Sequence, residues 1–374
     1  MAAPRRGRPV RAPAHDRFHD SPFIRAARGL PVSRVPVWFM RQAGRALPEY
    51  RAARGSGSIL DAIAQPELVA ELTRQPVDRY GTDAAIFFSD IVVPAAAVGF
   101  GVDIAPGTGP VVANPFRSKE DLQRLRPLEP PVDTSYVIEA VGILAEELTV
   151  PLIGFAGGPF TVASYLVEGG PSKSFTKIKA LMHGEPALWA QLTDRLVDLA
   201  LASLRSQLDA GASAIQVFDS WAGILTPQHY AELVLPATKR LFAELATTHP
   251  GTPTILFGVG TGELLSLMAG SGCDVVGIVW RVPLDQARLR VGPDVAVQGN
   301  LDPALCLTNW DVVAEETRDV LDRAGTAPGH IFNLGHGVLP ETDPAILEQV
   351  VELVHAEGRA GVGAEGGTGA EGAR

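Results

Sequence analysis

The stretch that decides the fold is ASAIQVFDS, residues Ala212–Ser220, which follows the pattern EPALWAQLTDRLVDLALASLRSQLDA at residues 185–210. The first segment is a short, mostly apolar run that ends in two polar residues, as expected of a buried strand. In the second segment apolar residues recur at intervals of three and four, which is typical of an amphipathic helix. A strand of this kind beside such a helix predicts parallel strands covered by helices on both faces.

The same alternation of strand and helix continues through most of the chain. Pro66, Pro186 and Pro227 suit the first turns of helices. Eight strands in a chain of this length predict an α/β fold, a (β/α)8 or TIM barrel, with an open doubly wound sheet as the alternative. The predicted strands are Val35–Met40, Ala84–Asp90, Val150–Ala156, Ala212–Ser220, Thr252–Val259, Asp274–Trp280, Val295–Asn300 and His330–Leu334.

Polar and glycine-rich residues directly follow most of these strands and favour the barrel. In a TIM barrel the C-terminal ends of several strands meet at one mouth, where the catalytic groups lie. We therefore expect an active-site cleft at these ends. The segments concerned are Arg41–Arg45, Ser89-Asp90, Gly157–Pro159, Asp219-Ser220, Gly258–Gly262, Asn300 and Gly335–Gly337.

Composition excludes several classes of protein. The 374 residues include 32 Lys+Arg and 42 Asp+Glu, a net charge of −10, which disfavours a nucleic-acid-binding protein. Hydrophobic residues make up 46%, enough for a large core, but no apolar run is long enough for a membrane helix. Two cysteines are too few for a disulfide framework, which favours a reducing, cytoplasmic location.

The two ends of the chain differ from its body. Residues 1–20 are rich in Arg, Pro and Ala and lack the apolar segment of a secretory signal, so we expect a disordered leader. Residues 356–374 are rich in Gly, Ala and Glu, which predicts a disordered tail. Residues 21–355 show no linker-like break and are expected to form a single barrel domain.

Two arginines stand four residues apart after the first strand. If their segment is helical, Arg41 and Arg45 share a face and could hold carboxylates bidentately. Salt bridges with carboxylates such as Glu49 are the alternative, and spacing alone does not decide between them.

Asp90 and His336 are further candidates. Asp90 lies in an apolar stretch, where a charge needs a partner, and its place at a strand end favours a ligand over backbone donors. His336 stands between two glycines, which leaves room for a ligand, although a lone histidine is more often a core residue. No metal-ligand motif occurs, and none of the five lysines follows a strand. These residue types suit a polycarboxylate substrate.

Several long motifs resemble the uroporphyrinogen decarboxylase family. PVWFMRQAGRALPEYR (Pro36–Arg51) resembles its N-terminal signature, and GFAGGPFTVASYLVEGG (Gly154–Gly170) resembles its second signature. Shorter matches are FFSDIVVP (Phe87–Pro94), QVFDSWAG (Gln216–Gly223), QGNLDP (Gln298–Pro303) and FNLGHGVLP (Phe332–Pro340). Together they extend over the whole body of the chain.

This resemblance implies a cytoplasmic, homodimeric TIM-barrel enzyme without a metal or organic cofactor. Such enzymes convert the four acetate groups of uroporphyrinogen III to methyl groups, giving coproporphyrinogen III on the route to haem. The resemblance makes Asp90 and Arg41 catalytic, with Arg54 as an additional carboxylate contact. The implied substrate-binding residues are Arg41, Gln42, Ala43, Gly44, Arg45, Asp90, Tyr165, Ser220 and His336.

One segment departs from the family pattern. Where the family usually has Gly-Leu-Asp-Trp-Thr, this chain has Gly277-Ile278-Val279-Trp280-Arg281. The rival hypotheses are a zinc-dependent corrinoid methyltransferase, which needs thiolate and imidazole ligands, and a catalytically silent tetrapyrrole-binding protein. Intact Asp90, Arg41 and Arg45 favour the decarboxylase.

Overall fold

Seven parallel strands form a curled sheet in which each strand neighbours the next one along the chain. The computed structural model describes residues 17–44, 46–105 and 107–358. Its sheet has the order β1-β4-β5-β6-β7-β8-β9, without the reversal of strand order that defines a doubly wound sheet. The strands are β1 Ala85–Ile86, β4 Leu152–Gly157, β5 Ala214–Phe218, β6 Thr254–Phe257, β7 Val275–Gly277, β8 Ala296–Gln298 and β9 His330–Ile331.

Residues 35–40 close the sheet into a barrel between β9 and β1. On one side the Phe332 N–H donates to the Pro36 carbonyl and the Trp38 N–H donates to the Phe332 carbonyl. On the other side the Asp83 N–H donates to the Val37 carbonyl over 2.8 Å. The predicted eight-membered barrel is therefore confirmed, and the doubly wound alternative is wrong.

This closing segment, predicted as the strand Val35–Met40, has only one strand-like bridge, Val37 with Phe332. Side chains take the place of backbone partners along it. The N–H groups of residues 37, 39 and 40 donate to side-chain oxygens of Asp83, Gln42 and Asn333 at 2.8, 2.9 and 3.0 Å. A ladder of backbone hydrogen bonds cannot form where these oxygens occupy the donors.

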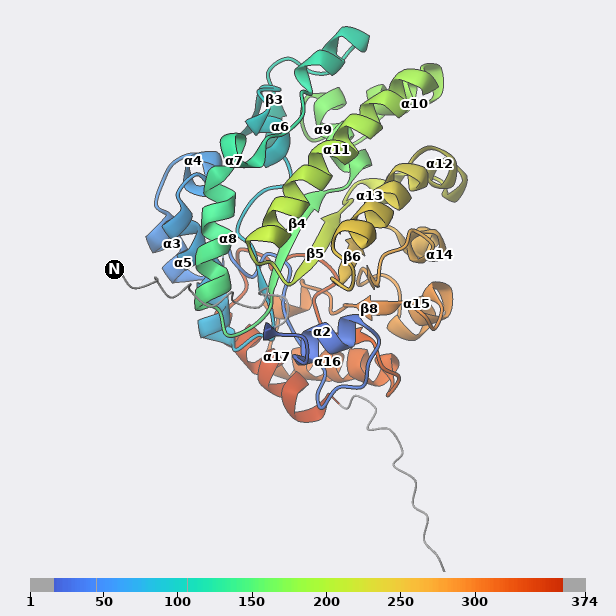
Figure 1. Cartoon of the computed structure of the whole chain (residues 1–374). Coiled ribbons are helices and arrows are strands. Elements are labelled where there is room, and N and C mark those ends of the chain that lie inside the picture. The colour runs from blue at the N-terminus through green and yellow to red at the C-terminus, as the bar shows by residue number, and fades with distance from the viewer. Residues whose placement is uncertain (1–16, 45, 106, 359–374) are drawn as a thin grey trace, which may run out of the picture.

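Helices surround the strands (Figure 1). Pro66, Pro186 and Pro227 each begin a helix, as predicted. The helices are α2 Pro22–Ala27, α3 Pro48–Arg54, α4 Ile59–Ile63, α5 Pro66–Tyr80, α6 Val93–Ala97, α7 Pro130–Asp133, α8 Ser135–Glu147, α9 Pro159–Glu168, α10 Thr176–Gly184, α11 Pro186–Ala210, α12 Pro227–Leu233, α13 Leu235–Thr248, α14 Leu265–Ala269, α15 Leu284–Val291, α16 Trp310–Ala324 and α17 Pro344–Glu357. An antiparallel hairpin, β2 Val102–Ala105 and β3 Gly109–Val112, is inserted after α6.

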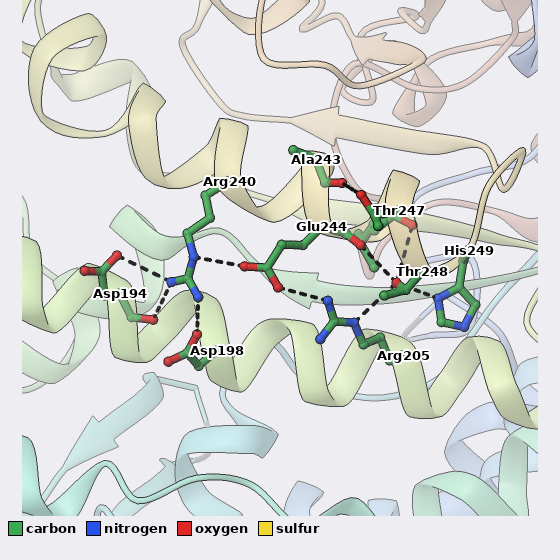
Figure 2. Close-up of polar contacts among 10 residues, drawn as sticks. Asp194, Asp198, Arg205, Arg240, Ala243, Glu244, Thr247, Thr248 and His249 are labelled. Carbon is green, nitrogen blue, oxygen red and sulfur yellow. Dashed lines mark hydrogen bonds and ion pairs between the residues drawn. The ribbon is translucent and has the colours of Figure 1, made fainter.

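Helices α11 and α13 lie side by side on the outside of the barrel (Figure 1). Arg240 of α13 makes ion pairs with Asp194 and Asp198 of α11 and with Glu244 of its own helix (Figure 2). These side chains are a third or more exposed, so solvent screens the network.

A second ion cluster joins the beginning of the described chain to its last helix. The Asp83 carboxylate, 5% exposed, accepts from Arg34 at 2.6 Å and from the Val37 N–H at 2.8 Å. The Nε2 atom of His355 on α17 lies 2.7 Å from Asp83 Oδ2, the oxygen that also accepts from the Val37 N–H. Burial by itself raises the pKa of Asp83, but the hydrogen bonds from His355 and Arg34 hold that pKa below its ordinary value.

The ordered body extends slightly beyond residues 21–355. Phe18 packs against the hydrophobic core, which places it outside the predicted leader. Ala356 and Glu357 complete α17 and therefore do not belong to the predicted tail. The rest of the leader and tail, residues 1–16 and 359–374, lies outside the described residues.

Candidate active site

Four of the residues expected in the site lie close enough to influence each other electrostatically. They come from the first, second and eighth segments of the barrel and from α9. Burial raises the pKa values of Asp90 and Tyr165 and lowers that of His336; the nearby charge of Arg41 acts on all three in the lowering direction, and the charge of Asp90 further raises the pKa of Tyr165. The C-terminal ends of the strands therefore bring these groups to one mouth, as the barrel fold requires.

Arg41 follows the closing segment in a left-handed conformation with φ of 60°. A β-carbon added to Gly337 would lie 2.5 Å from Arg41 Cδ and 2.8 Å from its Cγ, so the aliphatic part of Arg41 rests on this glycine. A β-carbon on Gly44 would lie 2.8 Å from the Arg41 carbonyl oxygen. Glycines on both sides thus make room for an exposed guanidinium at the mouth.

Residues 41–44 form turns, and the next helix, α3, begins only at Pro48. The condition that Arg41 and Arg45 share a helical face is therefore not met by the described part of this loop. Arg45 itself lies outside the described residues. Glu49, the suggested salt-bridge partner, pairs with Arg79 at 3.7 Å.

Asp90 lies in the loop between β1 and α6. Burial raises its pKa above the ordinary value, although hydrogen bonds from the Val92 and Ile91 N–H groups and the charge of Arg41 lower it. The Val92 N–H donates to Oδ1 over 3.0 Å. Asp90 is thus a half-buried carboxylate that retains acceptor capacity for donors on a ligand.

Tyr165 comes from α9 and contacts Trp221, which follows the predicted strand end Asp219-Ser220. Their ring centroids are 6.1 Å apart with the planes at 65°. Burial raises the pKa of the Tyr165 hydroxyl, while the neighbouring Trp221 side chain lowers that pKa to a smaller extent. The phenol therefore stays protonated near neutral pH and can donate a hydrogen bond.

His336 stands between two aromatic walls. The centroid of its ring lies 6.5 Å from that of the Phe257 ring and 6.2 Å from that of the Trp280 ring, both in edge-to-face geometry. Burial, and secondarily the charge of Arg41, lower the pKa of His336. A neutral imidazole is therefore expected at neutral pH, with one ring nitrogen as donor and the other as acceptor.

Ser220 is half-buried, and its carbonyl accepts from the Val259 N–H over 3.3 Å. Among the described residues, none forms a hydrogen bond with its hydroxyl. The hydroxyl is therefore available to a ligand.

Other expected residues support the loops of the site. The buried Gln42 amide accepts from the Phe39 N–H and donates to the Ala84 carbonyl over 3.0 Å, so it secures the closing segment. Ala43 is half-buried in the same turn. Arg54 donates to the carbonyls of Gly55 and Gly57 and thereby holds its own loop.

Asp219, which the sequence places beside Ser220, points into the protein. Its side chain is 1% exposed and accepts from the Thr161 N–H and hydroxyl at 2.9 and 2.6 Å. Burial raises its pKa to about 6. Asp219 was expected to face the mouth as Asp90 does, but its carboxylate is turned inward to Thr161.

The segment that departs from the family pattern forms the wall beside His336. Val279 is buried, and its carbonyl accepts from the Asn300 amide over 3.1 Å. The Arg281 guanidinium lies 4.9 Å from the centre of the Trp280 ring. The aromatic walls formed by Phe257, Trp280 and Trp221 were missed in the sequence, although Trp221 directly follows Ser220 and Phe257 directly precedes the expected segment Gly258–Gly262.

The described part of the chain offers neither a metal site nor a membrane-spanning helix. No group of three or more His, Cys, Asp or Glu side chains has the arrangement of a metal site there. In the same residues, no helix is long and apolar enough to cross a membrane.

The closed sheet and the polar residues at its strand ends define a (β/α)8-barrel enzyme with an arginine, an aspartate, a tyrosine and a histidine at its mouth. Comparison with known proteins narrows this class. The family model for uroporphyrinogen decarboxylase (URO-D) matches residues 18–357. The chain belongs to this family.

Relatives with the name uroporphyrinogen decarboxylase support the assignment. The protein from Streptomyces coelicolor is 56% identical over 340 residues, 91% of this chain and 95% of its own length. The protein from Thermobifida fusca is 58% identical over 341 residues, 91% of this chain and 94% of its own.

Among solved structures, a methyltransferase from Methanosarcina mazei has a TM-score of 0.73 at 20% identity and covers 92% of this chain and 98% of its own. At that identity the likeness supports the fold alone.

Proposed function

We propose that this chain decarboxylates uroporphyrinogen III, removing the carboxylates of its four acetate groups to give coproporphyrinogen III. Membership of the family and relatives of the same name at 56–58% identity support this activity. The observation that carries the mechanism is the half-buried Asp90 carboxylate beside Arg41, at a mouth where a ring of pyrrole N–H donors can approach it.

The reaction needs an electron sink, because breaking the bond to the carboxylate leaves an electron pair on the methylene carbon. Protonation of the ring carbon beside the acetate makes the pyrrole cationic, and the cation accepts that pair as CO2 leaves. A second proton converts the exocyclic methylene to methyl, and loss of the first proton restores the pyrrole. The protonated ring is the sink, so this route requires no metal or organic cofactor.

The roles of the residues follow from their chemistry. A fixed carboxylate at Asp90 accepts from the pyrrole N–H groups and stabilises the positive ring in a site from which water is largely excluded. The Arg41 guanidinium stays protonated, as arginine side chains do in proteins, and holds a substrate carboxylate. Tyr165, Ser220 and His336 add hydrogen-bonding groups around the macrocycle, with Arg45 as a further carboxylate ligand.

Incubation with uroporphyrinogen III under anaerobic conditions, followed by mass spectrometry, tests the activity. We expect successive products that have lost one to four CO2. Binding of the substrate without loss of CO2 would identify a silent tetrapyrrole-binding protein. Stoichiometric zinc together with methyl transfer to a thiol would favour the methyltransferase hypothesis.

The resemblance also supports a homodimer in the cytoplasm. Both cysteines, Cys273 and Cys306, are buried free thiols, which suits a reducing compartment. Light scattering coupled to size-exclusion chromatography tests the dimer. A mass of about one chain at micromolar concentration would contradict it.

A further inference from the structure

A chain of contacts leads from the buried Asp219 to the tyrosine at the mouth. Asp219 Oδ1 accepts both the hydroxyl and the N–H of Thr161, at 2.6 and 2.9 Å. The Thr161 hydroxyl oxygen in turn accepts from the main-chain N–H of Trp221 over 3.0 Å. The Trp221 ring then packs edge-to-face against the ring of Tyr165, with centroids 6.1 Å apart.

Each member of this chain is fixed by more than one contact. Thr161 is fully buried in the first turn of α9, the helix that carries Tyr165 one turn further on. A β-carbon on Gly158 would lie 2.5 Å from Asp219 Cβ and Cγ, so the carboxylate packs directly on the backbone that leads into α9. Phe175 packs on the Trp221 ring, with centroids 5.4 Å apart.

The second oxygen of Asp219 shows that this arrangement is not explained by stability alone. Oδ2 is buried and has no hydrogen-bond partner among the described residues. A buried acceptor without a partner costs free energy, and an apolar side chain at this position would avoid the cost. The carboxylate contributes what an apolar group cannot, since it orients the Thr161 hydroxyl so that its lone pairs face the Trp221 N–H.

We propose that Asp219 and Thr161 are positioning residues for the decarboxylation, which act by holding Trp221 so that its ring, packed edge-to-face against Tyr165, sets the position of that tyrosine at the mouth. This inference rests on the proposed function for its kinetic consequences. Its structural part, the dependence of Tyr165 on Thr161, does not. Neither residue touches the substrate in this arrangement, because both lie beneath the wall of the mouth.

The kinetic test replaces the Thr161 hydroxyl while retaining the shape of the side chain. Thr161→Val should lower kcat/KM about 5- to 30-fold, in line with the loss of hydrogen bonds that orient one catalytic group. Thr161→Ser restores the hydroxyl and should stay within about threefold of the wild type. The matched control is Thr193→Val in α11, a buried threonine whose hydroxyl bonds only to carbonyls of its own helix.

A double-mutant cycle shows whether Thr161 acts through Tyr165. In a Tyr165→Phe background, Thr161→Val should lower kcat/KM by less than about twofold, because the hydroxyl it positions is already gone. Trp221→Phe, which changes the ring that packs against Tyr165 at the other end of the chain, should couple to Tyr165→Phe in the same way. Additive losses in both cycles, or a Thr161→Ser variant as impaired as Thr161→Val, would overturn the proposal.

A second readout uses the free protein and is independent of any activity. The chain has five tyrosines, so 3-fluorotyrosine gives few 19F resonances, and Tyr165→Phe identifies the one from Tyr165. This resonance should move in Thr161→Val and stay in place in Thr193→Val. An unmoved resonance in Thr161→Val refutes the positioning role. If the Tyr165 resonance moves in Thr161→Val as expected but the wild-type protein leaves uroporphyrinogen intact, the proposed function alone is refuted.

Discussion

The side chain of Arg41 lies on the backbone of Gly337, so the first and last barrel segments meet at the mouth. Only a hydrogen atom fits on this side of Gly337, because a β-carbon would lie within 2.5 to 3.2 Å of three Arg41 carbons. The glycine therefore determines where the guanidinium stands, without contacting a ligand itself.

Gly337→Ala should displace Arg41 and weaken carboxylate binding. We expect KM for uroporphyrinogen to rise about 10-fold or more, since one misplaced charge-assisted hydrogen bond costs about 1.5 kcal/mol. Steady-state kinetics measures the effect. The matched control is Gly142→Ala in α8, where an added β-carbon meets nothing within 4 Å and helix propensity should raise stability slightly. An unchanged KM in Gly337→Ala would contradict the dependence of Arg41 on this glycine.

Asp90→Asn should separate catalysis from binding. The positive charge on the ring exists only during the reaction, so loss of the carboxylate charge should lower kcat by about 10²- to 10³-fold and change coproporphyrinogen binding much less. Arg41→Ala should instead lose more in binding. A near-normal kcat with a raised KM in Asp90→Asn would reduce Asp90 to a binding residue.

The pH profile gives an independent test of Asp90. Burial raises the pKa of this carboxyl, and only its ionised form stabilises the cationic ring. As pH falls through that raised pKa, kcat/KM should decrease. The residual activity of Asp90→Asn should lack this acid limb, and an unchanged limb in the variant would assign it to another group.

Asp219→Asn should stabilise the protein at alkaline pH. The pKa of Asp219 is about 6 in the folded state, against 3.8 ordinarily, so the folded protein binds the proton more tightly than the unfolded chain. Stability from this group is therefore full below about pH 4 and is lost as pH rises through 6. By urea unfolding, the variant should gain about 1–3 kcal/mol at pH 8 and little at pH 4.5. An equal change at both values would contradict the raised pKa.

The Asp83 cluster should contribute much more to stability than the surface network of Figure 2. Asp83→Asn leaves Arg34 and His355 without the carboxylate that joins them, and should cost about 3–5 kcal/mol in urea unfolding. The same substitution at Asp198, which is half exposed, should cost less than about 1 kcal/mol. Similar costs at the two positions would show that closure of the barrel does not depend on Asp83.

Removal of residues 359–374 should leave folding and activity unchanged, provided that Gly358 is kept. The carbonyl of Gly358 accepts from the Val35 N–H over 3.3 Å, and its backbone lies against the Val35 side chain. We expect the same urea midpoint and kcat/KM as the full chain. A stop before Gly358 should lower the midpoint, and an effect of the shorter deletion alone would give the tail a role.

The barrel was predictable because buried parallel strands leave a strong apolar pattern. Each of the seven sheet strands lies within its expected segment or, for β4, extends one residue beyond it. Residues 35–40 were expected to pair through the backbone, but the oxygens of Asp83, Gln42 and Asn333 replace those partners. Which side chain will bond to a backbone N–H depends on tertiary contacts. The β2–β3 hairpin was also missed, because its strands are only four residues long and β3 begins with a glycine and a proline.

The active site, like the fold, could be predicted only in part. Asp90 and His336 were expected from their places after strands, and the structure brings both near Arg41. Asp219 has an equivalent place in sequence, yet it turns inward to Thr161, because the direction of a strand-to-helix loop depends on what packs beside it. The role of Gln42 in holding the closing segment depends on a contact with Ala84, 42 residues away, which no local pattern reveals.

The joining of Arg34, Asp83 and His355 has a consequence for the biosynthesis of this protein. A ribosome must complete most of the chain before His355 can reach Asp83, and His336 is made almost 300 residues after Arg41. The incomplete chain meanwhile carries a strand edge without its neighbour, which is the kind of surface that promotes aggregation. Nascent chains arrested before β9 should therefore need chaperones and lack the His336 side of the mouth, so the mouth is assembled only near the end of translation.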